Sequence, residues 1–365
     1  MEVTEPTRQT FLALIRLGIG HVVTVLPQSI KWESMYNLAY EQGLSAIMLD
    51  GAEALSNRGE LVGGWTMDKQ LKKQWIAEVI QNHEQLYEDY RKSIGRLAQF
   101  YDGYGVKMMV LKGYGLSLNY PIPEHRPCGD IDIWLFGEYQ KADSALRREL
   151  GIKIDESHHH HTSFHWNGYL VENHYDWLNV YAHRSSAQME KVFKELAKDD
   201  SNYVEIDGQR VYLPSPNLHA LFVLRHSMSH FAAKRMKIRQ LLDWGFFVEK
   251  HTKEIDWDWL IKTLEQFHML DFFTCLNSIC VSDFGFDFSI FPPIQIDVFL
   301  KDRILNDMLS PEFSGEPPSG FLKLVFFKYR RWKANEWKHK LCYQESMFSS
   351  FWRGVWARIL KPAMI

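Results

Sequence analysis

The 365-residue chain has few cysteines and no long apolar segment. Its four cysteines lack the paired spacing of a thiol redox motif or a zinc ribbon. No apolar run reaches the roughly 18 residues that a membrane-spanning helix needs. The N-terminal stretch MEVTEPTRQT is polar and lacks the pattern of a secretion signal. These absences argue against a disulfide scaffold and an integral membrane protein, and they predict a location in the reducing cytoplasm.

What the chain does contain is ample material for a packed interior. Hydrophobic residues make up 46% of the sequence and aromatic residues 14%, which argues against disorder. A chain of this length exceeds the usual size of a single core, so two or three units are expected. The formal net charge of −3 hides an asymmetry, because the segment from Phe321 onward has ten Lys and Arg against two Glu.

Hydrophobic periodicity divides the chain into three predicted regions. Residues 1–102 show helical spacing, including one long amphipathic helix over 68–101 that ends at Gly103. Residues 103–215 mix helices with short strand-like runs, of which VKMMVL (106–111) and IDIWLF (131–136) are the clearest. Residues 216–365 are again helical and end in a basic, aromatic tail. The prediction is an α+β protein with a small mixed sheet between N-terminal and C-terminal helical regions.

The segment HHHHTSFHWNGYLVENHYDW predicts a β-hairpin, because Asn167-Gly168 is a favoured two-residue turn. This turn pairs Trp166 with Tyr169 and places alternate side chains on opposite faces. One face is mainly apolar and should contact the core. The other face should meet water or a site, and it carries His159, His161, Ser163, His165, Glu172, His174 and Asp176.

Two aspartates provide the strongest chemical signal in the chain. Asp130 and Asp132 are two residues apart in a strand candidate, so both carboxylates should project from one face. Paired carboxylates suit divalent cations, and Glu172 on a nearby strand could complete a two-metal site. Gly113, after the preceding strand, would let backbone amides approach a phosphate, and Arg126 could neutralise a leaving pyrophosphate.

These residues resemble the nucleotidyltransferase superfamily with the polymerase-beta-type fold. LKG at 111–113, the stretch from Tyr120 to Leu135 that ends in GDIDIWL, and VENH at 171–174 are similar to a family of uncharacterised bacterial nucleotidyltransferases. The later RHSMSHF and RQLLDW segments also resemble the helical half of that family.

The resemblance implies an enzyme that moves a nucleoside monophosphate from an NTP to a hydroxyl acceptor and releases pyrophosphate. It implies that Asp130, Asp132 and Glu172 ligate two Mg²⁺ ions, or Mn²⁺ in their place. The nucleotide would contact Lys112, Gly113, Tyr114 and Arg126. His161, His165 and His174 are candidate substrate contacts. The acceptor is open, with a small molecule or a protein favoured over RNA.

Three alternatives remain open from the sequence. Tyr114 stands where the superfamily usually has a small residue. The chain could therefore be a catalytically inactive nucleotide-binding or protein-interaction module. Asp176 shares the predicted face of Glu172 and could be the third carboxylate. The histidines could form a zinc-binding module.

For the basic tail, a packed amphipathic helix pair is favoured over contact with a membrane surface or nucleic acid.

Overall fold

The computed structural model describes residues 4–25, 29–57, 66–181, 183–233, 235–293, 295, 297–313, 315, 317–346, 348 and 352. They form two compact units. The sheet unit takes in residues 82–223 and 253–256 with the described residues after 344, and the helical unit the described residues of 1–81, 224–252 and 257–344. Among the described residues, no helix is both long and apolar enough to cross a membrane. The region boundaries after residues 102 and 215 stay predictions.

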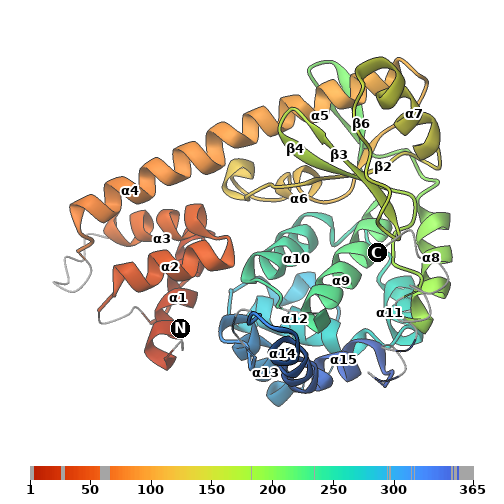
Figure 1. Cartoon of the computed structure of the whole chain (residues 1–365). Helices are drawn as coiled ribbons and strands as arrows, with labels where there is room; N and C mark the ends of the chain where they lie inside the picture. The colour runs from red at the N-terminus through yellow and green to blue at the C-terminus, as the bar shows by residue number, and fades with distance from the viewer. Residues whose placement is uncertain are drawn as a thin grey trace. The chain divides into compact units, whose positions relative to one another are not determined.

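The sheet unit contains a six-stranded mixed sheet in the order β3-β4-β2-β1-β6-β5. Its strands are β1 (Met109–Val110), β2 (Ile131–Trp134), β3 (His161–Trp166), β4 (Tyr169–His174), β5 (Tyr203–Ile206) and β6 (Gln209–Tyr212). β2 runs parallel to β4 and antiparallel to β1, while β1 runs parallel to β6. A mixed sheet within a largely helical chain confirms the predicted α+β class (Figure 1).

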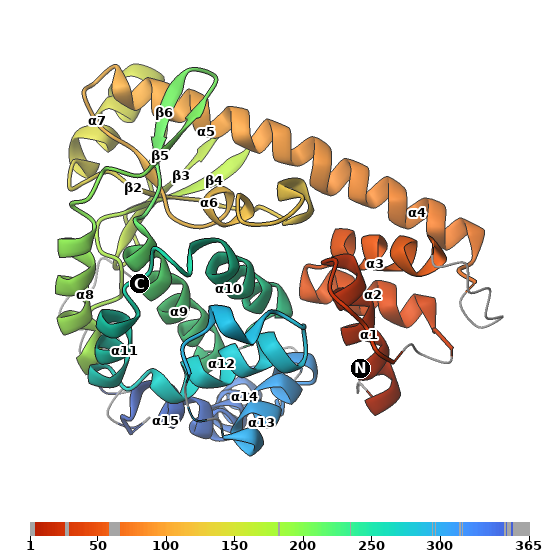
Figure 2. The same ribbon diagram turned by 180° about the vertical axis from the view of Figure 1, so that it is seen from behind.

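The helices of the sheet unit flank these strands. They are α5 (Leu86–Asp102), α6 (Tyr114–Ser117), η2 (Pro123–His125), α7 (Tyr139–Leu150), α8 (Arg184–Leu196) and the first part of α9 (Pro216–Ala233). Apolar side chains of α5 and α7 share one buried cluster with Ile131, Ile133, Phe164 and Val171 of the sheet. Figure 2 shows the same strands from behind. The polar side chains of β2 and β4 therefore lie on the opposite face.

The hairpin has the predicted register. Trp166 pairs with Tyr169, and the ladder continues to His161 opposite His174. Its turn end is attached to α5, since Trp166 Nε1 donates to Ser93 O at 3.0 Å. The polar face differs from an open water-facing surface, because His161 and His174 are each only 5% exposed. Because β4 pairs with β2, His174 lies beside Asp132, and its Nε2 is 3.1 Å from Asp132 Oδ1.

The helix predicted over 68–101 forms as three consecutive segments, α4 (Lys69–Val79), the π-helix η1 (Ile80–Gln85) and α5. Asp68 caps the start, where its side chain accepts from the amides of Gln70 and Leu71. Gly103 caps the end, as expected. The periodicity of the sequence does not predict this π-helical segment, and the apolar residues Ile80, at its start, and Leu86, directly after it, are 42% and 46% exposed.

The helical unit has an aromatic and aliphatic interior and no strands among its described residues. Its further elements are α1 (Glu5–Gly18), α2 (Trp32–Gln42), α3 (Ser45–Asn57), α10 (Ile238–His251), α11 (Trp257–Gln266), α12 (Leu270–Ser282), η3 (Phe288–Ile290), α13 (Val298–Leu309), α14 (Phe321–Ala334) and α15 (Glu336–Tyr343). α1 and α3 approach closely at Gly18 and Gly51. A Cβ on Gly18 would lie 1.9 Å from Ile47 O, so only glycine allows this contact.

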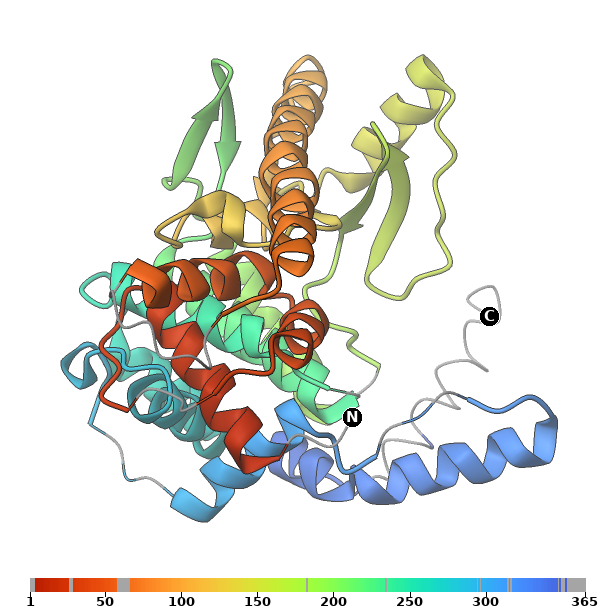
Figure 3. The same cartoon turned by 90° about the vertical axis from the view of Figure 1, so that its left-hand side faces the viewer.

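The basic tail departs in part from the favoured prediction of packed aromatics. Figure 3 draws the backbone of α14 in blue. Several apolar side chains of this helix are exposed, with Leu322 81% and Phe326 62% exposed. α15 instead buries several of its side chains, including Lys338, which pairs with Asp307. The packing prediction is therefore wrong for α14 and correct for part of α15. Residues 353–365 lie outside the described residues.

Candidate functional site

Two carboxylates meet on the polar face of the sheet because two parallel strands align. Asp132 of β2 pairs in register with Glu172 of β4. Residues directly opposite on adjacent strands project from the same face, about 4.8 Å apart along the hydrogen-bonding direction. Ile131 and Ile133, which flank Asp132, lie in the core cluster on the other side. The alternation of the IDIW sequence thus sends one carboxylate toward Glu172.

Asp132 is the most enclosed acid of this face, at 2% exposed. Its Oδ1 lies 2.7 Å from Lys112 Nζ and 3.1 Å from His174 Nε2. Burial acts to raise the pKa of Asp132, but the attraction of Lys112 and His174 outweighs it and holds the pKa well below its usual value. Burial likewise acts to lower the pKa of Lys112, and the charge of Asp132 reverses that effect. The carboxylate therefore attracts cations strongly.

Asp130 and Glu172 extend this acidic group. Asp130 directly precedes β2, and its carbonyl oxygen accepts a hydrogen bond from Tyr90 Oη at 2.8 Å. Although the residue as a whole is exposed, loss of water around its carboxyl group and the charge of Asp132 raise the pKa of Asp130. The pKa of Glu172 is lowered, first by its contact with His174. A cation bound between Asp132 and Asp130 would relieve the repulsion between these two carboxylates.

The turn after β1 follows the predicted glycine chemistry. Gly113 has φ +45°, and a Cβ there would lie 2.4 Å from Tyr90 Oη. Arg126 is buried and its Nη1 donates to Gly113 O at 3.1 Å, so the guanidinium supports the turn from within the chain. The side chain of Tyr114 packs in the core against Tyr87, with ring centroids 6.0 Å apart. Its bulk is therefore directed into the interior.

Histidines form a second group beside the carboxylates. His160, His161 and His174 each offer a ring nitrogen within 4.8 Å of the others. Both ring nitrogens of His161 and the Nδ1 atoms of His160 and His174 are buried, and none of them has a hydrogen-bond partner in the described part of the chain. Burial lowers the pKa of His160 to about 3 and of His161 to about 4. These two rings are therefore neutral at physiological pH.

The structure brings most of the predicted site residues together and separates two. Asp132, Glu172 and His174 form one compact group, with Lys112 in contact. His165 is exposed near the turn of the hairpin and belongs to neither group. Asp176 forms an ion pair with Lys194 of α8, which leaves Glu172 as the carboxylate beside Asp132.

Sequence reasoning missed two contributors. His160 is not among the predicted site residues, but its carbonyl accepts from the amides of Tyr175 and Asp176, which holds it at the end of β4. Tyr90 lies within the predicted amphipathic helix, and no sequence pattern predicts its hydrogen bond to Asp130 O. The run of four histidines in the sequence includes His160. However, His160 precedes β3, which begins at His161, so strand alternation does not predict the direction of its side chain.

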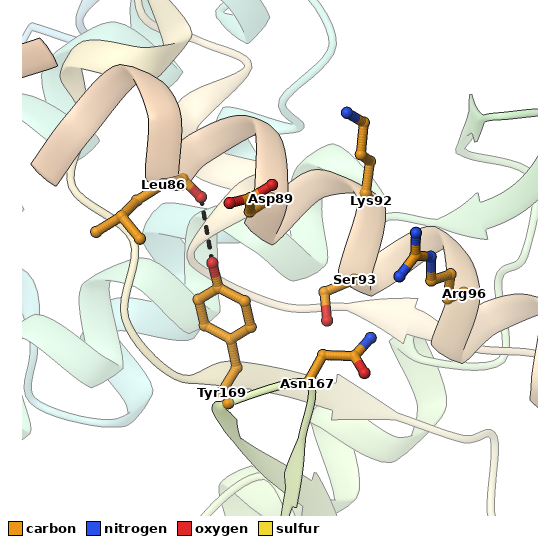
Figure 4. A pocket seen from close by; sticks show the side chains of 8 residues that line it. Leu86, Asp89, Lys92, Ser93, Arg96, Asn167 and Tyr169 are labelled. Carbon is orange, nitrogen blue, oxygen red and sulfur yellow. Dashed lines mark hydrogen bonds between the residues drawn. The ribbon is translucent and has the colours of Figure 1, made fainter. Parts of the chain in front are cut away.

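A separate pocket of about 440 Å³ lies at the turn end of the hairpin, away from the carboxylates. Figure 4 shows Ser93 of α5 pointing toward Asn167, while Lys92 points away from it, and Tyr169 Oη donates to Leu86 O at 3.3 Å. Lys92 and Arg96 of the same helix also line the pocket. The pocket contains one carboxylate, Asp89, beside two cationic side chains. It is distinct from the site built on Asp132.

Comparison with known protein families decides where the chain belongs. A family model described as "Uncharacterised nucleotidyltransferase" matches residues 28–285, well over half of the chain. The chain belongs to this nucleotidyltransferase family. The match includes every residue of the site described above, from Tyr90 to His174.

Two further comparisons complete this result. No curated protein matches the chain. Among solved structures, the chain is similar to an antigenic nucleotidyltransferase-like protein from Paracoccidioides brasiliensis, with 16% sequence identity and a TM-score of 0.34. That similarity covers 48% of this chain and 87% of the other.

Proposed function

We propose that this protein transfers a nucleoside monophosphate from an NTP to a hydroxyl acceptor. An acceptor oxygen would bond to the α-phosphorus, the bond from that phosphorus to the pyrophosphate would break, and the acceptor proton would pass to a base or to water. The register of Asp132 opposite Glu172, with Asp130 at the start of the same strand, is the observation that carries the proposal.

The side chains fit magnesium, which the reaction class requires. Asp130, Asp132 and Glu172 supply the hard carboxylate oxygens that Mg²⁺ or Mn²⁺ prefers. Asp132 already holds a cation, the Lys112 ammonium group, at 2.7 Å. When bound, two such ions would neutralise charge on the attacking and leaving oxygens. The three carboxylates would hold these ions, and Glu172 would either help ligate the ion that activates the acceptor hydroxyl or act as the base for its proton.

Lys112, Gly113, Tyr114 and Arg126 are the proposed nucleotide-binding residues. When metal and nucleotide bind, Lys112 would exchange its contact with Asp132 for a contact with a phosphate. The exchange is favourable because the phosphate, like the Asp132 carboxylate, is an anion that attracts the ammonium group. Gly113 would allow close approach of the backbone, and the buried Arg126 would maintain that turn through Gly113 O. Tyr114 would contribute its backbone rather than its ring, which packs against Tyr87.

The acceptor site is proposed beside the histidines. His161 and His174 lie within 3.8 Å of Glu172, so an acceptor hydroxyl near the proposed base would also meet imidazole groups. His165, at the far end of β3, would contact only an extended acceptor. A small molecule or a protein side chain is favoured over RNA.

A catalytically inactive nucleotide-binding module is the second candidate. The observation that favours it is the close Lys112–Asp132 ion pair, which satisfies the carboxylate without a metal ion. In that case the site around Asp132 would bind a nucleotide or a protein partner without transferring a nucleoside monophosphate. The two candidates differ in whether Mg²⁺ strengthens nucleotide binding.

The test is calorimetric titration of the full chain with each of the four NTPs, with and without Mg²⁺. The proposal expects Mg²⁺-dependent binding of at least one NTP that the Asp130→Asn/Asp132→Asn double variant loses. The matched control is His165→Ala, which changes an exposed residue of the neighbouring strand. Metal-independent binding that survives in the double variant would instead support the inactive module.

A further inference from the structure

The histidine group has unsatisfied buried nitrogens that the proposed transfer reaction does not use. His161 is 5% exposed, and neither of its ring nitrogens has a hydrogen-bond partner among the residues that the structure describes. His174 is equally enclosed, and its Nδ1 likewise has no hydrogen bond within the described part of the chain. Buried polar atoms in folded proteins are nearly always paired, so such a cluster calls for an explanation.

The backbone holds these three rings together, two from the end of the histidine run and one from β4. His161 pairs with His174 across the β3–β4 ladder, with ring centroids 5.2 Å apart. His160 is held at the end of β4, where its carbonyl accepts from Tyr175 and Asp176 amides at 3.0 and 3.1 Å. One ligand atom from each ring lies within 4.8 Å of the other two. Ligands around one tetrahedral zinc ion lie about 3.3 Å apart, so the rings would close in slightly when an ion binds.

We propose that His160, His161 and His174 form a binding site for one divalent transition-metal ion of the zinc class. Neutral imidazole is a preferred ligand of such ions, and three histidines with one open position form a known zinc ligand set. Nδ1 is the His174 atom assigned to this ion, because His174 Nε2 faces Asp132 Oδ1 at 3.1 Å.

The proposed ion is distinct from the magnesium of the transfer reaction. Its ligands are nitrogen atoms, whereas Asp130, Asp132 and Glu172 offer only oxygen. His174 connects the two groups, because a ring that binds a metal through one nitrogen is commonly oriented by a carboxylate at the other. Asp132 occupies that orienting position. The inference does not depend on whether the chain transfers nucleotides.

The experiment titrates chelator-treated, full-length protein with Zn²⁺ alone, in competition with a chromophoric chelator. The proposal expects one Zn²⁺ per chain, with affinity weakened about tenfold or more in His161→Ala and in His174→Gln. His165→Ala, on the same strand, and Asp130→Asn should bind Zn²⁺ as tightly as the unchanged protein. Thermal melting of each variant without metal confirms that it is folded.

Two rival sources of zinc binding give different patterns. If the consecutive histidines bind the ion at the surface, His158→Ala weakens binding and His174→Gln does not. If the ion sits between Asp132, Glu172 and His174, Glu172→Gln weakens binding while His160→Ala has no effect. Either pattern, or no binding to the folded protein, overturns the proposal. Co²⁺ in place of Zn²⁺ provides a second readout, since nitrogen ligation in the site gives a visible absorption band that His161→Ala should abolish.

Discussion

Two groups of polar side chains share His174 but differ in their chemistry. The first is rich in oxygen and charge, and contains Asp132, Glu172 and the Lys112 ammonium group. The second is rich in neutral nitrogen, and contains His160 and His161. Ion pairs connect the members of the first group, whereas ring nitrogens of the second have no hydrogen-bond partner among the described residues. Adjacent positions on one sheet face can thus favour different cations.

The difference arises from strand pairing. Asp132 enters the first group through the parallel β2–β4 ladder, and His161 enters the second through the antiparallel β3–β4 ladder. β4 takes part in both, so Glu172 and His174 lie where the two ladders meet. A change in one group should therefore leave the other largely intact unless it touches β4.

The largest expected effect is on magnesium-dependent binding. Asp132→Asn should weaken Mg²⁺-dependent NTP affinity, and any transfer activity, by about 100-fold or more, because a preorganised charge is removed from the reacting region. His160→Ala should change the same quantity by less than about threefold. Calorimetry on both variants measures the contrast, and equal losses would show that the two groups act as one.

Stability provides the second contrast, now within the oxygen-rich group. Asp132→Asn should lower the free energy of unfolding by about 3 kcal/mol, because it leaves the Lys112 ammonium group enclosed without its partner. Lys112→Met combined with Asp132→Asn should recover part of that loss. Asp130→Asn should change stability by no more than about 0.5 kcal/mol. Denaturant unfolding measures all three values. An Asp132→Asn variant as stable as the unchanged protein would contradict the importance of the ion pair.

Gly113 tests whether the turn is sterically required. Gly113→Ala should cost about 1–3 kcal/mol, because alanine disfavours a φ of +45° and its Cβ would meet Tyr90 Oη at 2.4 Å. Adding Tyr90→Phe removes that oxygen and should restore part of the stability. Urea midpoints of the single and double variants measure this, and no recovery would mean that backbone strain alone sets the loss.

A smaller effect than at Asp132 or Gly113 is expected at the turn end of the hairpin. Trp166→Phe removes the hydrogen bond to Ser93 O and should cost about 1 kcal/mol. Mg²⁺-dependent NTP binding and Zn²⁺ binding should both stay unchanged, since this end lies away from His161 and Asp132. A large loss of either ligand would show that the anchoring of the hairpin to α5 controls the site.

Local signals predicted the hairpin well. Asn167-Gly168 alone determines the register, and that register correctly places His161 opposite His174. The Asp-apolar-Asp pattern likewise identified the strand that carries Asp132. Neither signal depends on distant parts of the chain, which is why a single sequence was sufficient.

Long-range pairing could not be predicted from these patterns. Nothing in the sequence states that β4 pairs with β2, so the polar face of the hairpin looked open to water although His174 is buried. The ion pair of Lys112 with Asp132 and the bond from Tyr90 to Asp130 O depend on the same assembly. For α14 the error is the opposite one, because packed side chains are predicted and exposed ones are observed. Periodicity predicts an amphipathic helix but does not identify what covers its apolar face.

The most direct test of the account counts Mn²⁺ ions bound in the presence of an NTP analogue that cannot be cleaved between the α- and β-phosphates. Electron paramagnetic resonance reports free Mn²⁺, so it measures occupancy without knowledge of the acceptor. The account predicts two analogue-dependent ions per chain, both lost in Asp130→Asn/Asp132→Asn and both kept in His160→Ala. Unchanged Mn²⁺ occupancy in the double aspartate variant would contradict a metal site on these carboxylates.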